Sequence, residues 1–152
     1  MARMTTMVTI ARPVEEVFAF FLALDENAPR TDPSVSVVKD PTGPTRAGTT
    51  FRFRQRFLGK QRETLTRFTD IEPDQVIGFE ARIGPMRPRC SLTFARTEAG
   101  TTVTFAGDSR PIGPLRLFSP LLNRKGQQVW SERLARIKTA LEEPAKIGRA
   151  HV

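Results

Sequence analysis

The residue types that most often perform catalysis or bind metal ions are scarce in this sequence of 152 residues. Its single cysteine is Cys90, and its single histidine is His151, one residue from the end. One cysteine cannot form a disulfide within the chain or a cysteine-based zinc site, and a Ser-His or Cys-His pair needs a histidine inside the fold. We therefore expect no metal site, no cofactor and no nucleophilic pair of that kind.

Four small or polar side chains fall on the same face as a series of phenylalanines, namely Gln55, Thr64, Thr66 and Cys90. Burying a polar group without a partner costs free energy, so each of them could orient a carbonyl or hydroxyl group of a ligand. For the two threonines we favour an ordinary role in a strand. Gln55 stands between two phenylalanines and is the better candidate.

Arg133 is the most unusual residue of the C-terminal segment, because it falls inside a stripe of apolar residues at helical spacing, between Val129 and Ile137. One hypothesis is that its guanidinium binds a ligand carboxylate or phosphate. The slightly favoured alternative is that Arg133 pairs with an acidic residue such as Asp70 or Asp108, or that its long side chain extends along the apolar surface and brings the charge to solvent at the rim of the sheet.

Gly126 lies in the same stripe and costs about 1 kcal/mol of helix stability relative to alanine. It either permits close contact with a sheet or leaves room for a ligand. An acid/base pair for catalysis is harder to identify. Asp70 is predicted to face inward and Arg62 to lie at the mouth of a cavity, but their spacing in the sequence does not identify them as a pair. The sequence therefore identifies no catalytic pair.

A sheet must position most of these residues. Between Thr49 and Asp108 apolar and polar residues alternate, as in strands with one buried face. A hairpin turn at Gly59-Lys60 would set Phe51 opposite Phe68 and Gln55 opposite Thr64. Further strands follow at Val76–Ile83 and around Cys90 to Phe94, and a turn at Glu98–Gly100 sets Phe94 opposite Val103 and Leu92 opposite Phe105.

Helices are predicted at both ends of the chain. A short strand at Met7–Ile10 leads to a helix over Val14–Leu24, and turn residues then precede a strand at Val35–Lys39. Ser119 and Pro120 form an N-cap and a first helical position, and the helix continues to Glu142. We expect one domain over residues 1–143, with a flexible tail over 144–152.

The sequence resembles the START/polyketide cyclase (SRPBCC) superfamily from about Met7 to Glu142. The matching segments are Val8–Phe21 (first strand and helix), Asp25–Asn27 (next helix), Gly48–Phe51 (second long strand), Phe68–Pro73 (corner), Gly100–Phe105 (last strand) and Leu134–Glu142 (end of the long helix). Many relatives carry a tryptophan where this chain has Thr31, a departure that concerns only the packing of the entrance. The resemblance implies an α+β helix-grip fold, with a curved antiparallel sheet around a long C-terminal helix.

The resemblance also implies a hydrophobic cavity between sheet and helix, used for lipid or polyketide binding and in some members for cyclisation or dehydration. From the residues alone, the apolar face is either a plain core or the wall of a cavity. With the resemblance we expect a non-catalytic protein that binds and could transport a hydrophobic small molecule; the alternative is a cyclase or dehydratase that uses the same cavity. The expected ligand-binding residues are Phe51, Phe53, Gln55, Phe57, Phe68, Phe79, Leu92, Phe94, Phe105, Gly126, Val129, Trp130 and Arg133.

The formal net charge of +8 suits an anionic partner, but no base-reading motif accompanies it, and the alternation separates Arg52 and Arg54 from the phenylalanines. We expect no nucleic-acid partner. The apolar and basic segment Ile112–Leu122 is either a buried helix start, which we favour, or a transient contact with an anionic membrane. Nothing selects between a monomer and a homodimer. With no long apolar N-terminal segment, we expect a cytoplasmic protein.

Overall fold

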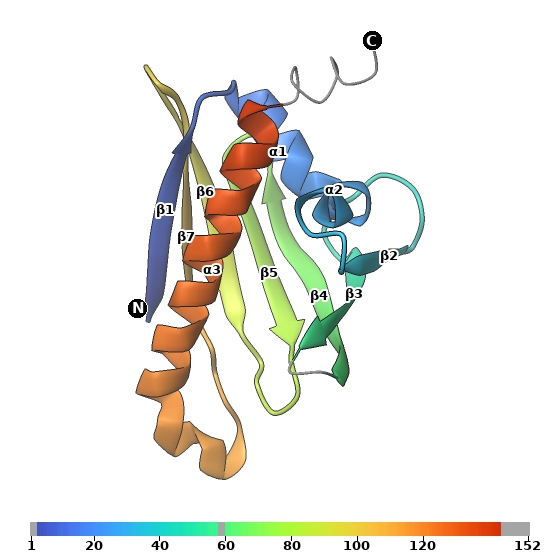
Figure 1. The fold of residues 1–152 in the computed structure, drawn as a ribbon, viewed down its shortest axis with the longest axis vertical. Coiled ribbons are helices and arrows are strands. Elements are labelled where there is room, and N and C mark those ends of the chain that lie inside the picture. Colours follow the sequence, from blue (N-terminus) through green and yellow to red (C-terminus); the bar gives the residue numbers. More distant parts are fainter. Residues whose placement is uncertain (1–2, 58–59, 144–152) are drawn as a thin grey trace.

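The computed structural model of the chain describes residues 3–57 and 60–143. A seven-stranded antiparallel sheet forms one layer, in the order β1-β7-β6-β5-β4-β3-β2, and the long helix α3 crosses one of its faces (Figure 1). This confirms the predicted α+β helix-grip architecture. The elements are β1 Met4–Ile10, α1 Val14–Leu22, α2 Leu24–Thr31, β2 Ser36–Asp40, β3 Thr50–Phe57, β4 Lys60–Glu72, β5 Val76–Arg82, β6 Arg89–Thr97, β7 Gly100–Asp108, the 3-10 helix η1 Gly113–Phe118 and α3 Ser119–Glu142.

The core lies between the inner face of the sheet and the helices. Residues of β7 alternate strictly between buried and half-buried, with Val103 and Phe105 completely buried. Leu134 and Ile137 of α3 are buried against this layer. Each such side chain contributes about 1.5–3 kcal/mol by leaving water, so the alternation of the sequence directly sets which face the helix covers.

The pairing of β3 with β4 differs from the predicted register by two residues. Phe51 pairs with Thr66 instead of Phe68, and Gln55 pairs with Arg62 instead of Thr64. The hairpin closes one residue earlier than predicted, between Phe57 and Lys60, and the connecting residues 58–59 lie outside the described residues. A shift of two residues leaves every side chain on its predicted face, which is why the apolar pattern cannot detect it.

A β-bulge in β4 reverses the predicted direction of Asp70. Phe68 pairs with Phe79 on the inner face, but Asp70 pairs with Gly78, and Thr69 is the extra residue. An inserted residue reverses the alternation that follows it. The prediction that Asp70 faces inward is therefore wrong: its side chain is exposed on the outer face, with Oδ2 2.9 Å from where a Cβ of Gly78 would be.

The helix boundaries also differ from the predictions. Helix α1 ends at Leu22 instead of Leu24. The turn-rich segment after it contains α2, in agreement with the helix that the resemblance places at Asp25–Asn27, and the buried Asn27 donates a hydrogen bond of 3.0 Å to the carbonyl of Phe20. Ser119 is not an N-cap. Because α3 continues directly from η1, the backbone of Ser119 is already helical. Its hydroxyl donates a hydrogen bond of 2.8 Å to the carbonyl of Arg116.

Helix α3 is hydrogen-bonded to the backbone of β1, the edge strand beside it. The Thr5 N–H donates to Gln127 Oε1 at 2.9 Å, and the Ala11 N–H, just beyond the strand, donates to Glu142 Oε2 at 2.8 Å. Lys138 Nζ donates to the carbonyl of Thr9 at 2.8 Å. Because β1 is at the edge of the sheet, these backbone groups have no neighbouring strand on that side, and side chains of α3 form the hydrogen bonds instead.

We predict that Glu142→Gln weakens this attachment in a pH-dependent way. The Lys138 ammonium, 2.6 Å away, and then the Ala11 N–H hold the pKa of Glu142 below its ordinary value of 4.5. Stability from this carboxylate is therefore present above about pH 4.5 and is lost as pH falls through the lower folded-state pKa. Urea unfolding should show a loss of about 1 kcal/mol or less at pH 7 that disappears towards pH 3. The exposed Glu132→Gln variant is the control, and a deficit independent of pH would contradict the prediction.

Candidate ligand-binding site

A continuous series of aromatic contacts runs across the inner face from β3 to α3. The ring centroids of Phe51 and Phe68 are 5.0 Å apart, and those of Phe68 and Phe79 are 6.5 Å apart. Phe79 lies 5.7 Å from Trp130, which stacks on Phe105 at 4.3 Å with an angle of 11° between the planes. The structure therefore brings these five predicted site residues together as one wall.

Phe94 belongs to a second aromatic group at the other end of the sheet. Its ring meets Phe18 at 5.0 Å and Phe21 at 5.5 Å, both edge-to-face, under helix α1. Leu92, opposite Phe105, is buried as well. The sequence reasoning did not include the α1 phenylalanines in the site, although their spacing of three residues places them on one helical face. This group closes the inner face at the α1 end.

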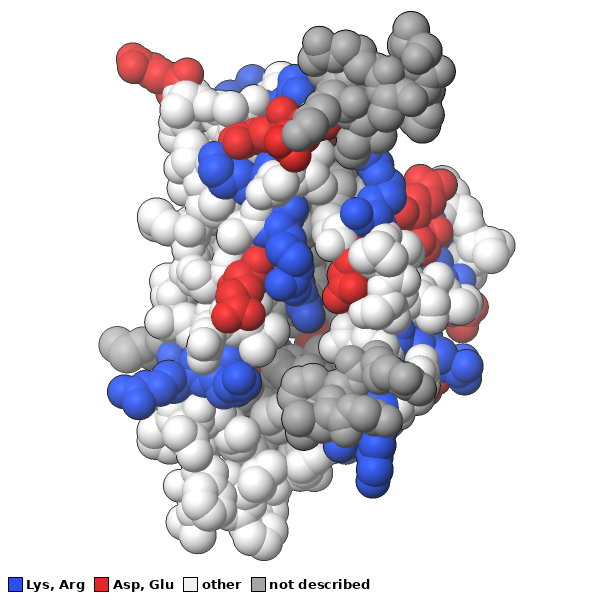
Figure 2. Space-filling view, in the orientation of Figure 1, with Lys and Arg blue, Asp and Glu red and all other residues white. Residues whose placement is uncertain are grey.

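The inner face is less covered towards the β3–β4 hairpin. Phe53, Gln55 and Ala81 are half-buried there, as are Val129 and Trp130 on the facing side of α3. Figure 2 shows this side of the molecule hollowed in its middle, beside a column of basic side chains. Of the predicted residues, the side chain of Phe57 lies outside the described part of the structure. The apolar wall thus has one end closed by α1 and one end that reaches solvent.

Arg133 lies at this partly open region. Its Cζ is 4.7 Å from the ring centroid of Trp130, a cation–π contact. Within the described residues no hydrogen bond or ion pair joins its guanidinium. The pKa of Arg133 is lowered, mainly by burial and then by the charge of Arg136, while Asp32 opposes this. The favoured pairing with Asp70 or Asp108 is wrong, because Asp70 is on the outer face and Asp108 lies 4.0 Å from Arg3.

Gly126 takes the first of its two predicted roles. A Cβ at this position would lie only 2.5 Å from Sδ of Met4, a buried residue of β1. The missing side chain therefore lets α3 approach the sheet and leaves no space for a ligand. The sequence reasoning also missed the buried Asn123, whose Oδ1 accepts a hydrogen bond of 2.9 Å from the N–H of Ser109. This bond fixes the first turns of the helix to the end of β7.

Cys90 is buried on the inner face, where Sγ would be 2.6 Å from a Cβ at Gly107. Burial is the main cause that raises the pKa of its thiol to about 12. Thr66 is buried and Thr64 half-buried, and Gln55 makes no hydrogen bond within the described structure. Gln55 therefore has an amide group on this face that no protein group of the described structure occupies.

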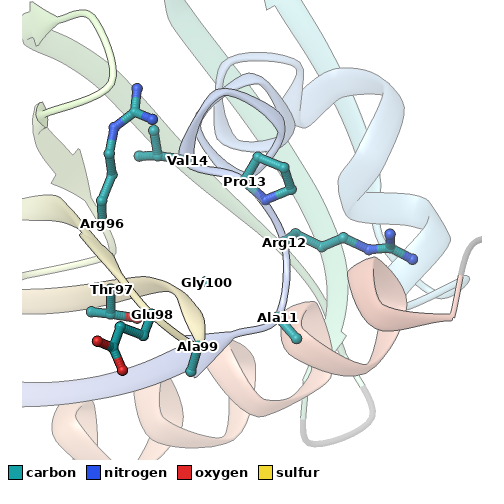
Figure 3. A pocket seen from close by; sticks show the side chains of 9 residues that line it. All are labelled: Ala11, Arg12, Pro13, Val14, Arg96, Thr97, Glu98, Ala99 and Gly100. Atoms are coloured by element: carbon teal, nitrogen blue, oxygen red, sulfur yellow. The ribbon is translucent and has the colours of Figure 1, made fainter.

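Two other hollows lie outside the sheet–helix interface. One, of about 380 Å³, separates the β6–β7 hairpin from the β1–α1 connection, and Figure 3 shows Arg12, Arg96 and Glu98 pointing away from it. Arg96 is held there by Glu15 at 2.7 Å. The other, of about 790 Å³, lies over Gly78 on the outer face of the sheet.

The described part of the chain holds no group of three or more His, Cys, Asp or Glu side chains that could bind a metal ion. None of the described helices is long and apolar enough to cross a membrane. On the outer face, the Nε atoms of Arg52 and Arg54 lie 3.7 and 3.3 Å from the carboxylate oxygens of Glu63. These arginines are separated from the phenylalanines by the sheet, as the alternation predicted.

A curved sheet that encloses an aromatic wall with one long helix defines the class of helix-grip proteins. The chain belongs to the family described as polyketide cyclase/dehydrase and lipid transport, whose model matches residues 1–142. No curated protein matches the sequence significantly.

Several solved structures share the fold. Ara h 8.0201 is 17% identical, with a TM-score of 0.71 over 91% of this chain and 93% of its own. TTHA0849 from Thermus thermophilus is 21% identical, with a TM-score of 0.67 over 92% and 94%. The di-domain ARO/CYC StfQ from the steffimycin biosynthetic pathway is 16% identical, with a TM-score of 0.68 over 97% of this chain and 51% of its own. At these identities the likeness concerns the fold.

We predict that Cys90 is chemically inert in the folded protein. With a pKa of about 12, its thiolate is scarce near pH 8, and the buried sulfur is also hard to reach. Labelling by a disulfide reagent at pH 8 should be at least about a hundred-fold slower in buffer than in urea. The same protein in urea serves as the control. Rapid stoichiometric labelling of the native protein would contradict a buried, protonated thiol.

Proposed function

We propose that this protein binds a hydrophobic small molecule that carries an anionic group, between the inner face of the sheet and helix α3. The observation that carries the proposal is Arg133. Its guanidinium stacks on Trp130 beside a half-buried apolar wall, and no acidic side chain of the described structure is paired with it. A partly buried cation that no ion pair neutralises is costly even though the charge of Asp32 acts favourably on it, and a ligand carboxylate or phosphate would supply a direct partner.

The surrounding residues suit an amphipathic ligand. Phe53, Val129 and Trp130 offer half-exposed apolar surface to its chain or ring system. The Gln55 amide can donate to a carbonyl or accept from a hydroxyl at the same end of the sheet. The family description, which names lipid transport as well as polyketide chemistry, supports ligands of this kind. Enclosure by apolar surface with one charge-assisted contact is the proposed mechanism.

The second candidate is a cyclase or dehydratase that uses the same site, and the family description favours it. Such an enzyme needs a proton donor or acceptor near its substrate. The inner-facing positions of the described strands carry no Asp or Glu. The charge of Asp32 opposes the lowering of the pKa of Arg133. Hydrogen bonds from Ser34 hold the pKa of Asp32 itself below its ordinary value, which suits a carboxylate that stays ionised more than a general acid.

We predict that Arg133→Met selectively weakens the binding of anionic ligands. A fluorescent long-chain carboxylic acid should bind about ten-fold more weakly, the loss expected for one charge-assisted hydrogen bond, while its methyl ester should bind equally well to both proteins. Lys125→Met removes a positive charge from an exposed position of the same helix and is the matched control. Equal losses for acid and ester, or for both variants, would contradict an anchoring role for Arg133.

Mass spectrometry of the purified protein, native and then after solvent extraction, should reveal a bound molecule in the wild type that is depleted in Arg133→Met. The expected molecule is largely apolar and carries a carboxylate or phosphate, because those groups complement the site. A bound molecule without an anionic group would contradict the proposed role of the arginine. A molecule that is chemically converted during incubation, with conversion lost in Asp32→Asn, would favour the enzyme.

A further inference from the structure

The start of α3 and the 3-10 helix before it expose an unusual amount of apolar surface. Ile112 is 48% exposed, Leu117 83%, Phe118 54% and Leu121 62%. We call these four residues the apolar tip. No residue of η1 is buried, so the favoured prediction of a buried helix start is wrong. In Figure 1 the segment extends beyond the end of the sheet opposite α1.

The charge around the apolar tip has one sign. Residues 109–131 contain Arg110, Arg116, Arg124 and Lys125 and no Asp or Glu, and all four basic side chains are exposed. Figure 2 shows basic side chains next to the uncharged lobe at the lower end of the molecule. Elsewhere on the described surface, arginines commonly have acidic partners, as Arg67 and Arg89 have in Glu80. An apolar projection with only positive charges around it complements an anionic lipid surface.

The tip is held in place by backbone contacts. The Ile112 N–H donates to the carbonyl of Pro85 at 2.9 Å, and the Arg87 N–H donates to the carbonyl of Arg110 at 3.1 Å. Met86 forms an isolated β-bridge with Pro111. The segment is therefore fastened to the β5–β6 connection in a position that directs its apolar side chains into solvent.

We propose that the apolar tip inserts into the surface of an anionic lipid membrane. Leu117, Phe118 and Leu121 would enter the boundary of the acyl chains, and Arg116 and Arg124 would contact lipid phosphates. Because Arg133 is twelve residues beyond Leu121 on the same helix, its position lies about 18 Å along the axis from the membrane-contacting turn. This inference does not depend on the proposed function, since a protein can dock on a membrane whatever it carries.

Flotation with lipid vesicles tests the proposal on the whole chain. Wild-type protein should bind vesicles of three parts phosphatidylcholine and one part phosphatidylglycerol about ten-fold more strongly than pure phosphatidylcholine, and added salt should weaken the binding. Leu117→Ser with Leu121→Ser, and separately Arg116→Glu with Arg124→Glu, should each lower binding about five-fold or more. All these residues are exposed, so the variants should keep the circular dichroism spectrum of the wild type.

Matched controls lie elsewhere on the surface. Val38, with the same 62% exposure as Leu121, is changed to serine, and the exposed Arg46 is changed to glutamate. Both should bind vesicles like the wild type. Wild-type protein that ignores anionic vesicles, or controls that lose binding as strongly as the tip variants, would overturn the proposal. So would a wild-type dimer in light scattering that the double serine variant converts to monomers, because the tip would then be a self-association surface.

Discussion

The attachment of α3 to β1 is the constraint on which the rest of the structure depends. The helix buries Leu134, Ile137 and Leu141 against the sheet and also supplies hydrogen-bond partners to the backbone at and just beyond the edge strand. One set of contacts lies on the face of the sheet and the other at its edge, so together they hold the helix in one position on the sheet. Gly126 then allows the close approach that this position requires.

That fixed helix gives each of its parts a different environment. Its last turns are bound to β1, its middle places Trp130 between Phe79 and Phe105, and its first turn is exposed next to η1. Trp130 is well anchored by two rings, and it therefore presents a rigid surface to the guanidinium of Arg133. The cation is tolerated without an ion-pair partner because the aromatic face replaces part of its lost hydration and the charge of Asp32 acts favourably on it.

The sequence predicted the faces of the sheet much better than its details. Alternation identified the inner residues because burial of apolar side chains depends only on their direction. The register of β3 with β4 and the bulge at Thr69 depend on turn geometry and sheet curvature, which leave no distinct pattern in one sequence. Arg133 was recognised as unusual from its place in the stripe, but its lack of a partner could not be predicted, since the bulge decides where Asp70 points.

The strand order has a consequence for how copies of this chain could join. An exposed sheet edge is a template for intermolecular strand addition, the first step towards aggregation. The helix side chains already occupy donors and an acceptor at the β1 edge, so that edge is a poor template. The opposite edge is β2, which has only five residues and ends in Lys39 and Asp40. A short strand with charged residues gives little length for pairing, so this open sheet is protected against growth at both ends.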